Sequence, residues 1–388
     1  MRTSIKLTLV LSVASNTAIA AQGLPVGPAR AYPEVGLTLQ HNDNVTMKNQ
    51  DEESSMMAIL SPRATLEHKQ KANTYQGTLG IDIGRYFSTS TDNYEDVQLG
   101  GKADWQIDRR ASFSLGADYM RGHDPRGSTD RGGISEPSTW NSYGMRGLFG
   151  YGMPRARIRL EGELGHTAKR YTDNASEADD KDETELTGRV YYRILPKTHL
   201  FVEASDAIIN YTLDSSKQDN NRFNLSVGAT WRATAKTTGR AKIGYLRKAF
   251  DDDSRDDFNG ISWQVAVQWK PLSRSTVDIA TGRYTADSTG VGDYLVTNDL
   301  SVTGTHIWMP RLSSSLGFYF ANTDFPTNNA AAGPERSDDT FNFNLAANYE
   351  LHKMVTVSGG VKFTDRDSNS DTEDYDQRIF FVTLKATY

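Results

Sequence analysis

The feature that most constrains the fold is an alternation of apolar and polar residues that recurs, between turns, from about residue 33 to the last residue. In "VQLGGKADWQI" (97–107) the apolar or small residues occupy every second position, and "RFNLSVGATWR" and "FNFNLAANYEL" follow the same rule. A period of two places each set on one face of a β-strand. The chain is therefore predicted to be all-β.

Two kinds of turn alternate along this pattern. One kind is short, as in "KQKAN", "MPR" and "KPLSR", and the other is mostly longer and acidic or rich in Gly and Asn, as in "GHDPRGSTDRGGISEP" and "RDSNSDTED". Eight short turns and nine loops join eighteen strands. This layout is typical of a transmembrane antiparallel up-and-down β-barrel of about 18 strands, with short periplasmic turns and longer extracellular loops. A soluble β-sandwich is the alternative.

The first twenty residues predict an export signal. Arg2 and Lys6 precede an apolar stretch, and Ala18-Ile19-Ala20 is a small-x-small cleavage site, which is the layout of a Sec signal peptide. We therefore predict a signal peptide at 1–20, a short periplasmic leader at 21–32 and a single barrel domain at 33–388. The predicted location is the outer membrane of a Gram-negative cell.

Composition and motifs argue against several functions. The formal net charge is -6, with no basic excess to neutralise nucleic-acid phosphates, and there is no cysteine. No zinc-protease, nucleotide-binding or nucleophile-elbow motif occurs, so neither an enzyme nor a cofactor or metal site is expected. The pair His123 and Asp124 fits a solvated loop better than a protease site. The acidic loops, such as 251–257, could hold calcium, but they lack calcium-loop spacing and fit charged, soluble loops better.

The polar phase of the strands predicts a charged lumen, because Arg or Lys facing lipid at mid-membrane would cost about 2–4 kcal/mol each. The predicted lumen-lining charges are Arg157, Arg159, Glu161, Glu163, Glu185, Arg189, Arg193, Arg240, Lys242, Lys248 and Asp278. These residues either attract an anionic solute or polymer, or pair across strands and stiffen the wall. The loops at 123–137 and 326–336 are long enough to fold in and plug the pore.

Two further sets of residues follow from a barrel. Aromatic residues beside short turns are predicted to form a girdle at the membrane interface, namely Trp105, Trp231, Trp269, Trp308 and Tyr349. The chain ends on the half-apolar strand "IFFVTLKATY", which must pair with the first strand, near "PEVGLTLQHND", to close the barrel. The residues of this closing strand are Phe380, Val382, Leu384 and Tyr388.

Several stretches resemble a known family, the putative β-barrel porins of type 2 that are associated with exopolysaccharide and capsule synthesis operons. They are "GLTLQHNDNV" (36–45), "ILSPRATLEHK" (59–69), "DIGRYFSTSTDNYEDVQLGGKADWQI" (82–107) and "GADYMRGHDPRGS" (116–128). The resemblance implies an 18-strand barrel near the exit route of a polymer. It also implies that the terminal aromatic strand serves as a signal for the assembly machinery, but it implies no active-site residue.

Three functions agree with these observations. The leading hypothesis is a channel for export of an exopolysaccharide or capsular polysaccharide, and the alternatives are a diffusion porin for small solutes and a plugged barrel that is a structural component of an export complex. The expected partners are outer-membrane lipids and lipopolysaccharide, the outer-membrane assembly machinery, a polysaccharide and periplasmic export proteins. No nucleic acid is expected.

Overall fold

The computed structural model describes residues 23–129, 134–153, 155–172, 176–232, 236–327 and 335–388. The predicted signal peptide (1–20) lies outside the described residues, as do parts of the loops at 123–137 and 326–336.

Eighteen long antiparallel strands form one closed barrel. Each strand pairs with the next along the chain, and β19 pairs with β2, which closes the ring. The strands of the first half are β2 Ala29–Asn42, β3 Ser55–Gln70, β4 Asn73–Tyr86, β5 Tyr94–Gln106, β6 Ala111–Asp124, β7 Ser138–Tyr151, β8 Ile158–Tyr171, β9 Lys181–Leu195 and β10 Thr198–Tyr211. Those of the second half are β11 Asn220–Trp231, β12 Thr237–Phe250, β13 Phe258–Trp269, β14 Ser275–Asp287, β15 Tyr294–Met309, β16 Leu312–Phe325, β17 Arg336–His352, β18 Val355–Ser368 and β19 Tyr375–Thr387.

A short additional strand, β1 (Leu24–Val26), precedes the barrel and pairs with the start of β2. The turn between them contains Gly27, whose φ of 58° lies in the left-handed region that glycine adopts without strain. The barrel strand β2 thus begins at Ala29, ahead of the expected boundary at 33, and most of the expected leader is a hairpin. This hairpin was not expected, since Pro and Gly in this segment favoured an irregular leader.

The connections confirm the predicted layout. The strand ends joined by short turns lie at one end of the barrel, hereafter the short-turn end, and those joined by longer loops lie at the other, the loop end. At the loop end a few segments form single 3-10 turns, for example Ser90–Asp92 and Glu177–Asp179. Among the described residues, no helix has the length and apolarity needed to span a membrane.

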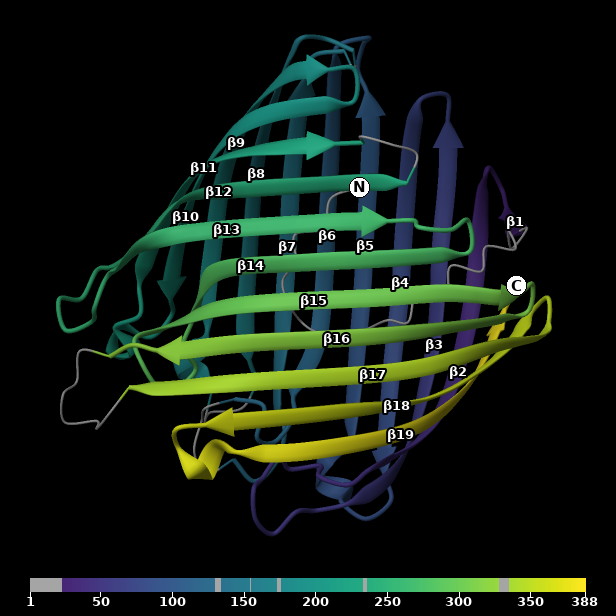
Figure 1. Cartoon of the computed structure of the whole chain (residues 1–388), viewed down its shortest axis with the longest axis vertical. Helices are drawn as coiled ribbons and strands as arrows, with labels where there is room; N and C mark the ends of the chain where they lie inside the picture. Colours follow the sequence, from purple (N-terminus) through teal and green to yellow (C-terminus); the bar gives the residue numbers. More distant parts are fainter. Residues whose placement is uncertain (1–22, 130–133, 154, 173–175, 233–235, 328–334) are drawn as a thin grey trace.

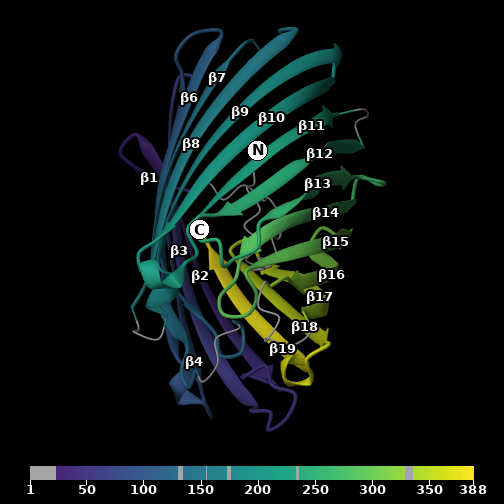
Figure 2. The same cartoon turned by 90° about the vertical axis from the view of Figure 1, so that its left-hand side faces the viewer.

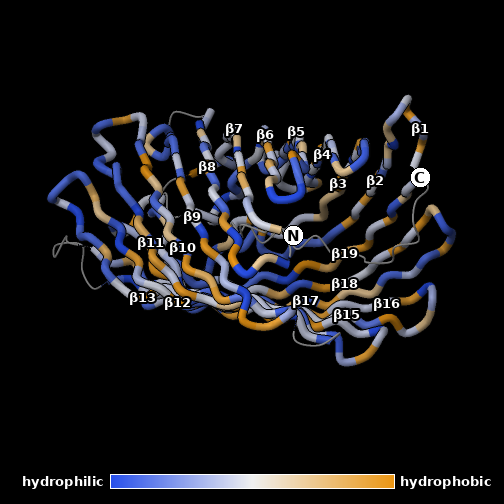
Figure 3. The backbone as a smooth tube through the Cα atoms, turned by 90° about the horizontal axis from the view of Figure 1, so that it is seen from above, coloured by the Kyte–Doolittle hydropathy of each residue, from blue (hydrophilic) through white to orange (hydrophobic). Residues whose placement is uncertain are grey.

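The barrel is flattened into two walls whose strands cross. In Figure 1 the strands β2 to β7 run upright at the back, whereas β13 to β19 run across the front. The side view in Figure 2 shows the strands fanning out as the wall turns from one direction into the other. Hydrophobic and hydrophilic positions alternate along the strands of both walls (Figure 3).

The apolar face of the sheet is its outer face. Leu37, Leu60 and Leu384 lie side by side across β2, β3 and β19 and are 47%, 42% and 47% exposed. The opposite face carries polar contacts, such as the 2.7 Å hydrogen bond between the hydroxyls of Thr38 and Thr383. A soluble sandwich would bury its apolar face, so these exposed leucines exclude that alternative and fit a barrel surrounded by lipid.

The closing strand is paired along nearly its whole length. Val382 lies opposite Leu39 and Leu384 opposite Leu37, and all four side chains share the outer face with Phe380. The last residue is also bonded, because the Tyr388 N–H donates to the Pro33 carbonyl at 3.2 Å. β19 therefore leaves no free edge between the two ends of the barrel.

Adjacent residues on β5 test which face meets lipid. Leu99 points outward near the middle of the strand and Gln98 points into the lumen. We expect Leu99→Arg to lower the free energy of unfolding in lipid by about 2–4 kcal/mol, and Gln98→Arg to change it by less than about 1 kcal/mol. Urea titration of the protein in phospholipid vesicles measures both, and equal effects would contradict the assigned faces.

Closure of the barrel is tested at Val382, which lies between Gly359 of β18 and Leu39 of β2. Val382→Pro removes a ladder donor and is expected to abolish the folded, heat-modifiable band on gels. Val382→Ala keeps the backbone donor and is expected to retain that band. A folded proline variant with wild-type mobility would show that closure tolerates a broken ladder.

Candidate functional site: charged clusters on the lumen wall

The lumen face of β7 to β12 carries charges at matching heights. In the strand register Arg189 of β9 lies opposite Glu161 of β8 on one side and Glu203 of β10 on the other. Because alternate residues point to the same face, these three side chains project together into the lumen. The wall thus brings opposite charges side by side at one level.

Glu203 is the centre of this arrangement and is only 5% exposed. Its Oε1 accepts a hydrogen bond from Lys242 Nζ at 2.6 Å. Its Oε2 accepts from Arg189 Nε at 2.5 Å and Arg240 Nη2 at 2.7 Å. The two β12 side chains reach Glu203 across β11, which has only Ser226 and Gly228 at this level. A Cβ on Gly228 would lie 2.4 Å from the Phe201 ring, so only glycine fits at this position.

A second carboxylate shares the same arginine. Glu163 accepts from Arg146 Nη1 at 2.7 Å and from Arg189 Nη1 at 2.6 Å. Arg159 lies 3.4 Å from Glu161 and its guanidinium covers the ring of Tyr191 at 4.5 Å.

We call this set the central cluster. Its members are Arg146, Arg159, Arg189, Arg240 and Lys242 with Glu161, Glu163 and Glu203. Cations outnumber carboxylates, so the cluster carries surplus positive charge. The carboxylates also hold the cations in fixed positions on the wall.

A second set, the outer cluster, lies nearer the loop end, about 26 Å further along β9. Asp287 forms ion pairs with Lys181 and with Lys248, whose side chain is fully buried. Beside them Arg222 Nη2 donates to Glu183 at 2.7 Å.

The position of Asp287 results from a departure of β14 from its neighbour. β14 pairs with β13 only as far as Arg283, but with β15 as far as Asp287. The end of this hairpin leans into the lumen, because Asp287 contacts the inward-facing side chains of β9 and β12. The following loop is held by Asp293, whose N–H donates to the Pro326 carbonyl at 2.7 Å. This hairpin end narrows the lumen at the loop end.

Side-chain hydrogen bonds also connect other loops to one another. Arg126 of the β6–β7 loop donates to Asp92 Oδ1 at 2.7 Å and to Glu53 Oε2 at 3.1 Å, and so joins three loops. The hydrogen bond to Asp92 raises the pKa of Arg126, so the guanidinium is charged at any physiological pH. Residues 130–133 of the 123–137 loop and 328–334 of the 326–336 loop lie outside the described residues, so the predicted plug by these loops stays a prediction.

The structure separates the predicted lumen charges into groups. Arg159, Glu161, Glu163, Arg189, Arg240 and Lys242 meet in the central cluster, and Lys248 lies in the outer cluster. Glu185 lies in the inward phase of β9 between the two clusters, near Arg222, and Arg193 lies in the same phase toward the short-turn end. Asp278 of β14 accepts a hydrogen bond from Nε2 of Gln268 on β13 at 3.0 Å. Arg157 lies in the β7–β8 turn, exposed, and its Nε donates to the hydroxyl of Tyr192 at 2.7 Å on the outer face. It is thus at the rim, because the strand and its alternation begin one residue later.

Several members of these clusters were not predicted from the sequence. Glu203 shares the inward phase of β10 with Phe201 and Ser205, so alternation could have found it. Arg146 could have been found in the same way on β7. Asp287 gave no such signal, because its contacts depend on the bend of β14.

The predicted girdle residues all lie on the outer face beside the short turns. Trp105 donates from Nε1 to the Tyr75 hydroxyl at 3.2 Å and stacks on Phe113 at 5.7 Å. Trp269 and Trp308 are 45% and 59% exposed. Trp231 and Tyr349 occupy the outward phase of β11 and β17 near the same end.

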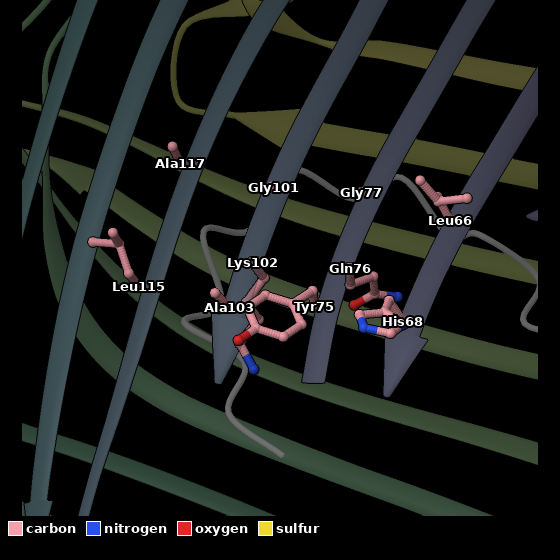
Figure 4. A pocket seen from close by; sticks show the side chains of 10 residues that line it. All are labelled: Leu66, His68, Tyr75, Gln76, Gly77, Gly101, Lys102, Ala103, Leu115 and Ala117. Atoms are coloured by element: carbon pink, nitrogen blue, oxygen red, sulfur yellow. The ribbon is translucent and has the colours of Figure 1, made fainter. Parts of the chain in front are cut away.

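A shallow groove of about 430 Å³ lies on the outer face near this end. Figure 4 shows its lining, which includes Leu66, Tyr75 and Leu115 around Gly77 and Gly101. The groove exists because Gly77 and Gly101 have no side chains to cover the backbone of the sheet at this point. Since the groove faces outward, it is separate from the lumen.

Within the described part of the chain, no group of three or more His, Asp or Glu residues is arranged to hold a metal ion. His123 and Asp124 do not form a pair with each other in the contacts described, since His123 Nδ1 bonds Asp96 and Asp124 accepts from Trp140 Nε1.

Solved structures of other proteins share this architecture. No curated protein is significantly similar to the chain. Among solved structures, Acinetobacter baumannii OccAB3 is 11% identical, with 94% of this chain and 100% of that chain covered and a TM-score of 0.50. Pseudomonas aeruginosa OccK2 (OpdF) is 10% identical, with 92% and 98% covered and a TM-score of 0.50. At such identities these structures share only the fold with this chain.

The location follows from the same observations. The closed barrel, its exposed apolar belt and its likeness to outer-membrane porins make this protein a multi-pass β-barrel of the outer membrane. The family described as "Putative beta-barrel porin 2" matches residues 17–388, and the chain belongs to that family.

Proposed function

We propose that this protein is a diffusion channel for small solutes that prefers anions. The observation that carries the proposal is the surplus of cations over carboxylates in the central cluster on the lumen wall. Fixed charge on the wall of an aqueous pore raises the local concentration of ions of the opposite sign. An 18-strand barrel is wide enough for such a pore.

The geometry of the central cluster suits a passing anion. Glu203 and Glu163 position the surrounding guanidinium and ammonium groups, so the cations need little rearrangement to meet a carboxylate or phosphate. A solute anion can exchange with a wall carboxylate as partner, which makes binding weak enough for release.

The same wall argues against a path for polysaccharide, which the family resemblance had made the leading hypothesis. Sugars slide along exposed aromatic faces, but the rings beside the central cluster are covered. Arg159 lies over Tyr191 at 4.5 Å and Arg240 over Phe201 at 4.3 Å. The outer cluster also narrows the lumen that a polymer would cross. These contacts favour small solutes.

Ion selectivity tests the role of the central cluster. We expect Lys242→Gln to lower the anion-to-cation permeability ratio about fivefold at low salt, because a unit charge ~8 Å away in water stabilises an anion and destabilises a cation by about 0.5 kcal/mol each. Lys242→Arg keeps the charge and is the matched control. Reversal potentials across planar bilayers under a salt gradient give the ratio.

The outcomes separate the candidate functions. A wild-type channel that prefers cations, or a glutamine variant with an unchanged ratio, would contradict the proposal. Steps blocked by an added polysaccharide but not altered by small organic anions would instead indicate a polymer conduit.

The outer cluster is tested by Asp287→Asn. This change removes the charge that holds the β14–β15 hairpin end against Lys181 and Lys248, so we expect larger single-channel conductance. Asp278→Asn, the same substitution in the same strand, is the control and is expected to leave conductance near wild type. Equal conductance of both variants and wild type would show that the hairpin end does not limit flow.

A further inference from the structure

A polar groove of about 360 Å³ lies on the barrel at the loop end of β4 to β7. Its lining residues are Arg85, Asn93, Tyr94, Glu95, Asp96, Arg121, His123 and Thr139. Its outward side is formed by Arg85, Glu95, Arg121 and Thr139, which are in the outward phase of β4 to β7, whereas Tyr94 and Asp96 are in the inward phase of β5.

The charged groups around the groove are paired with one exception. Arg85 forms an ion pair with Glu95 and donates to the Tyr94 carbonyl at 3.1 Å. His123 bonds Asp96 at 2.9 Å and stacks on Tyr94 at 4.1 Å. Arg121 is exposed and has no hydrogen bond or ion pair with any residue that the structure describes.

This isolation distinguishes Arg121 from comparable arginines. Other outward-facing arginines near the loop end have acceptors on neighbouring strands or loops. Arg170 bonds Asp182, Arg247 lies 3.6 Å from Asp257, Arg283 bonds Asn298 and Arg378 bonds Asp376. Arg121 is therefore a cation with no acceptor among the described residues, and its guanidinium is available to an external anion.

The height of Arg121 indicates which anion meets it. Phe113, which stacks on the girdle residue Trp105 near the short-turn end, lies eight residues before Arg121, which is about 26 Å of strand. At a tilt of about 40° this distance spans about 20 Å of bilayer, close to the thickness of the apolar band. The outward residues between them are Leu115, Ala117 and Tyr119, which offer a surface for acyl chains.

We propose that the groove at Arg121 binds a phosphate group of lipid A, the membrane anchor of lipopolysaccharide. At this height the outer leaflet presents phosphate groups above acyl chains, and Arg matches phosphate by paired donors. The guanidinium binds the phosphate while the acyl chains lie along the apolar surface below, beside the Tyr119–Tyr143 ring pair. The pair Arg85–Glu95 fixes the outward wall of the groove beside Arg121. This proposal does not depend on the proposed channel function.

The test is native mass spectrometry of the folded, full-length protein in detergent, titrated with bis-phosphorylated lipid A. We expect Arg121→Gln to weaken binding about tenfold, as for loss of one hydrogen-bonded charge contact. Arg378→Gln, an outward arginine paired with Asp376 near the same end, is the control and should bind as wild type does. Arg121→Lys should retain part of the affinity, and heat-modifiable mobility confirms that each variant is folded.

Two further probes separate the possible sources of phosphate. Lipid A stripped of its phosphates should bind like the Arg121→Gln variant, and inorganic phosphate at millimolar concentration should not displace the intact lipid. The proposal is overturned if wild type does not bind lipid A, if Arg121→Gln binds it equally well, or if inorganic phosphate displaces it freely. Channel conductance of Arg121→Gln is expected to stay at the wild-type value.

Discussion

The backbone hydrogen-bond ladder between β19 and β2 is the constraint on which the rest of the structure depends. Lipid offers no partner to a free N–H or C=O group, so a membrane-spanning sheet must close on itself. Here closure uses the last residues of the chain, down to the Tyr388 N–H bonded to Pro33. Once the ring is closed, each residue of a strand has only two directions available, lipid or lumen.

Those two directions account for the charge arrangement of the lumen. Arg and Lys side chains on the polar phase avoid lipid, and the strand register brings them level with carboxylates on the neighbouring strands. The paired side chains of the central cluster are held in fixed positions, and the surplus of cations makes this part of the wall positively charged. The same rule applied to the outer face leaves leucines in contact with lipid and confines outward charges to the ends of the strands, where Arg121 lies.

The two clusters have different relations to the fold. The central cluster lies on strands whose pairing is regular, so its geometry is a property of the wall itself. The outer cluster depends on the end of β14, which leaves β13 after Arg283 and brings Asp287 to β9 and β12. The width of the lumen at the loop end therefore depends on a bend and two ion pairs, whereas the charge of the central wall does not.

The sequence by itself determined the fold class, the number of barrel strands, the ends at which turns and loops lie, and the face of most residues. It could do so because the period of two and the alternation of turn lengths are properties of short segments of the chain. Closure of the barrel does not alter them. It also placed Arg189, Arg240 and Lys242 in the lumen by phase alone. Only the tertiary structure decided which charges meet, because Glu203 binds side chains from strands on either side of it, one of them two strands away. The inward lean of β14, the hairpin at β1 and the lack of a partner for Arg121 among the described residues likewise depend on the tertiary structure. Each depends on contacts between segments that the sequence pattern does not relate.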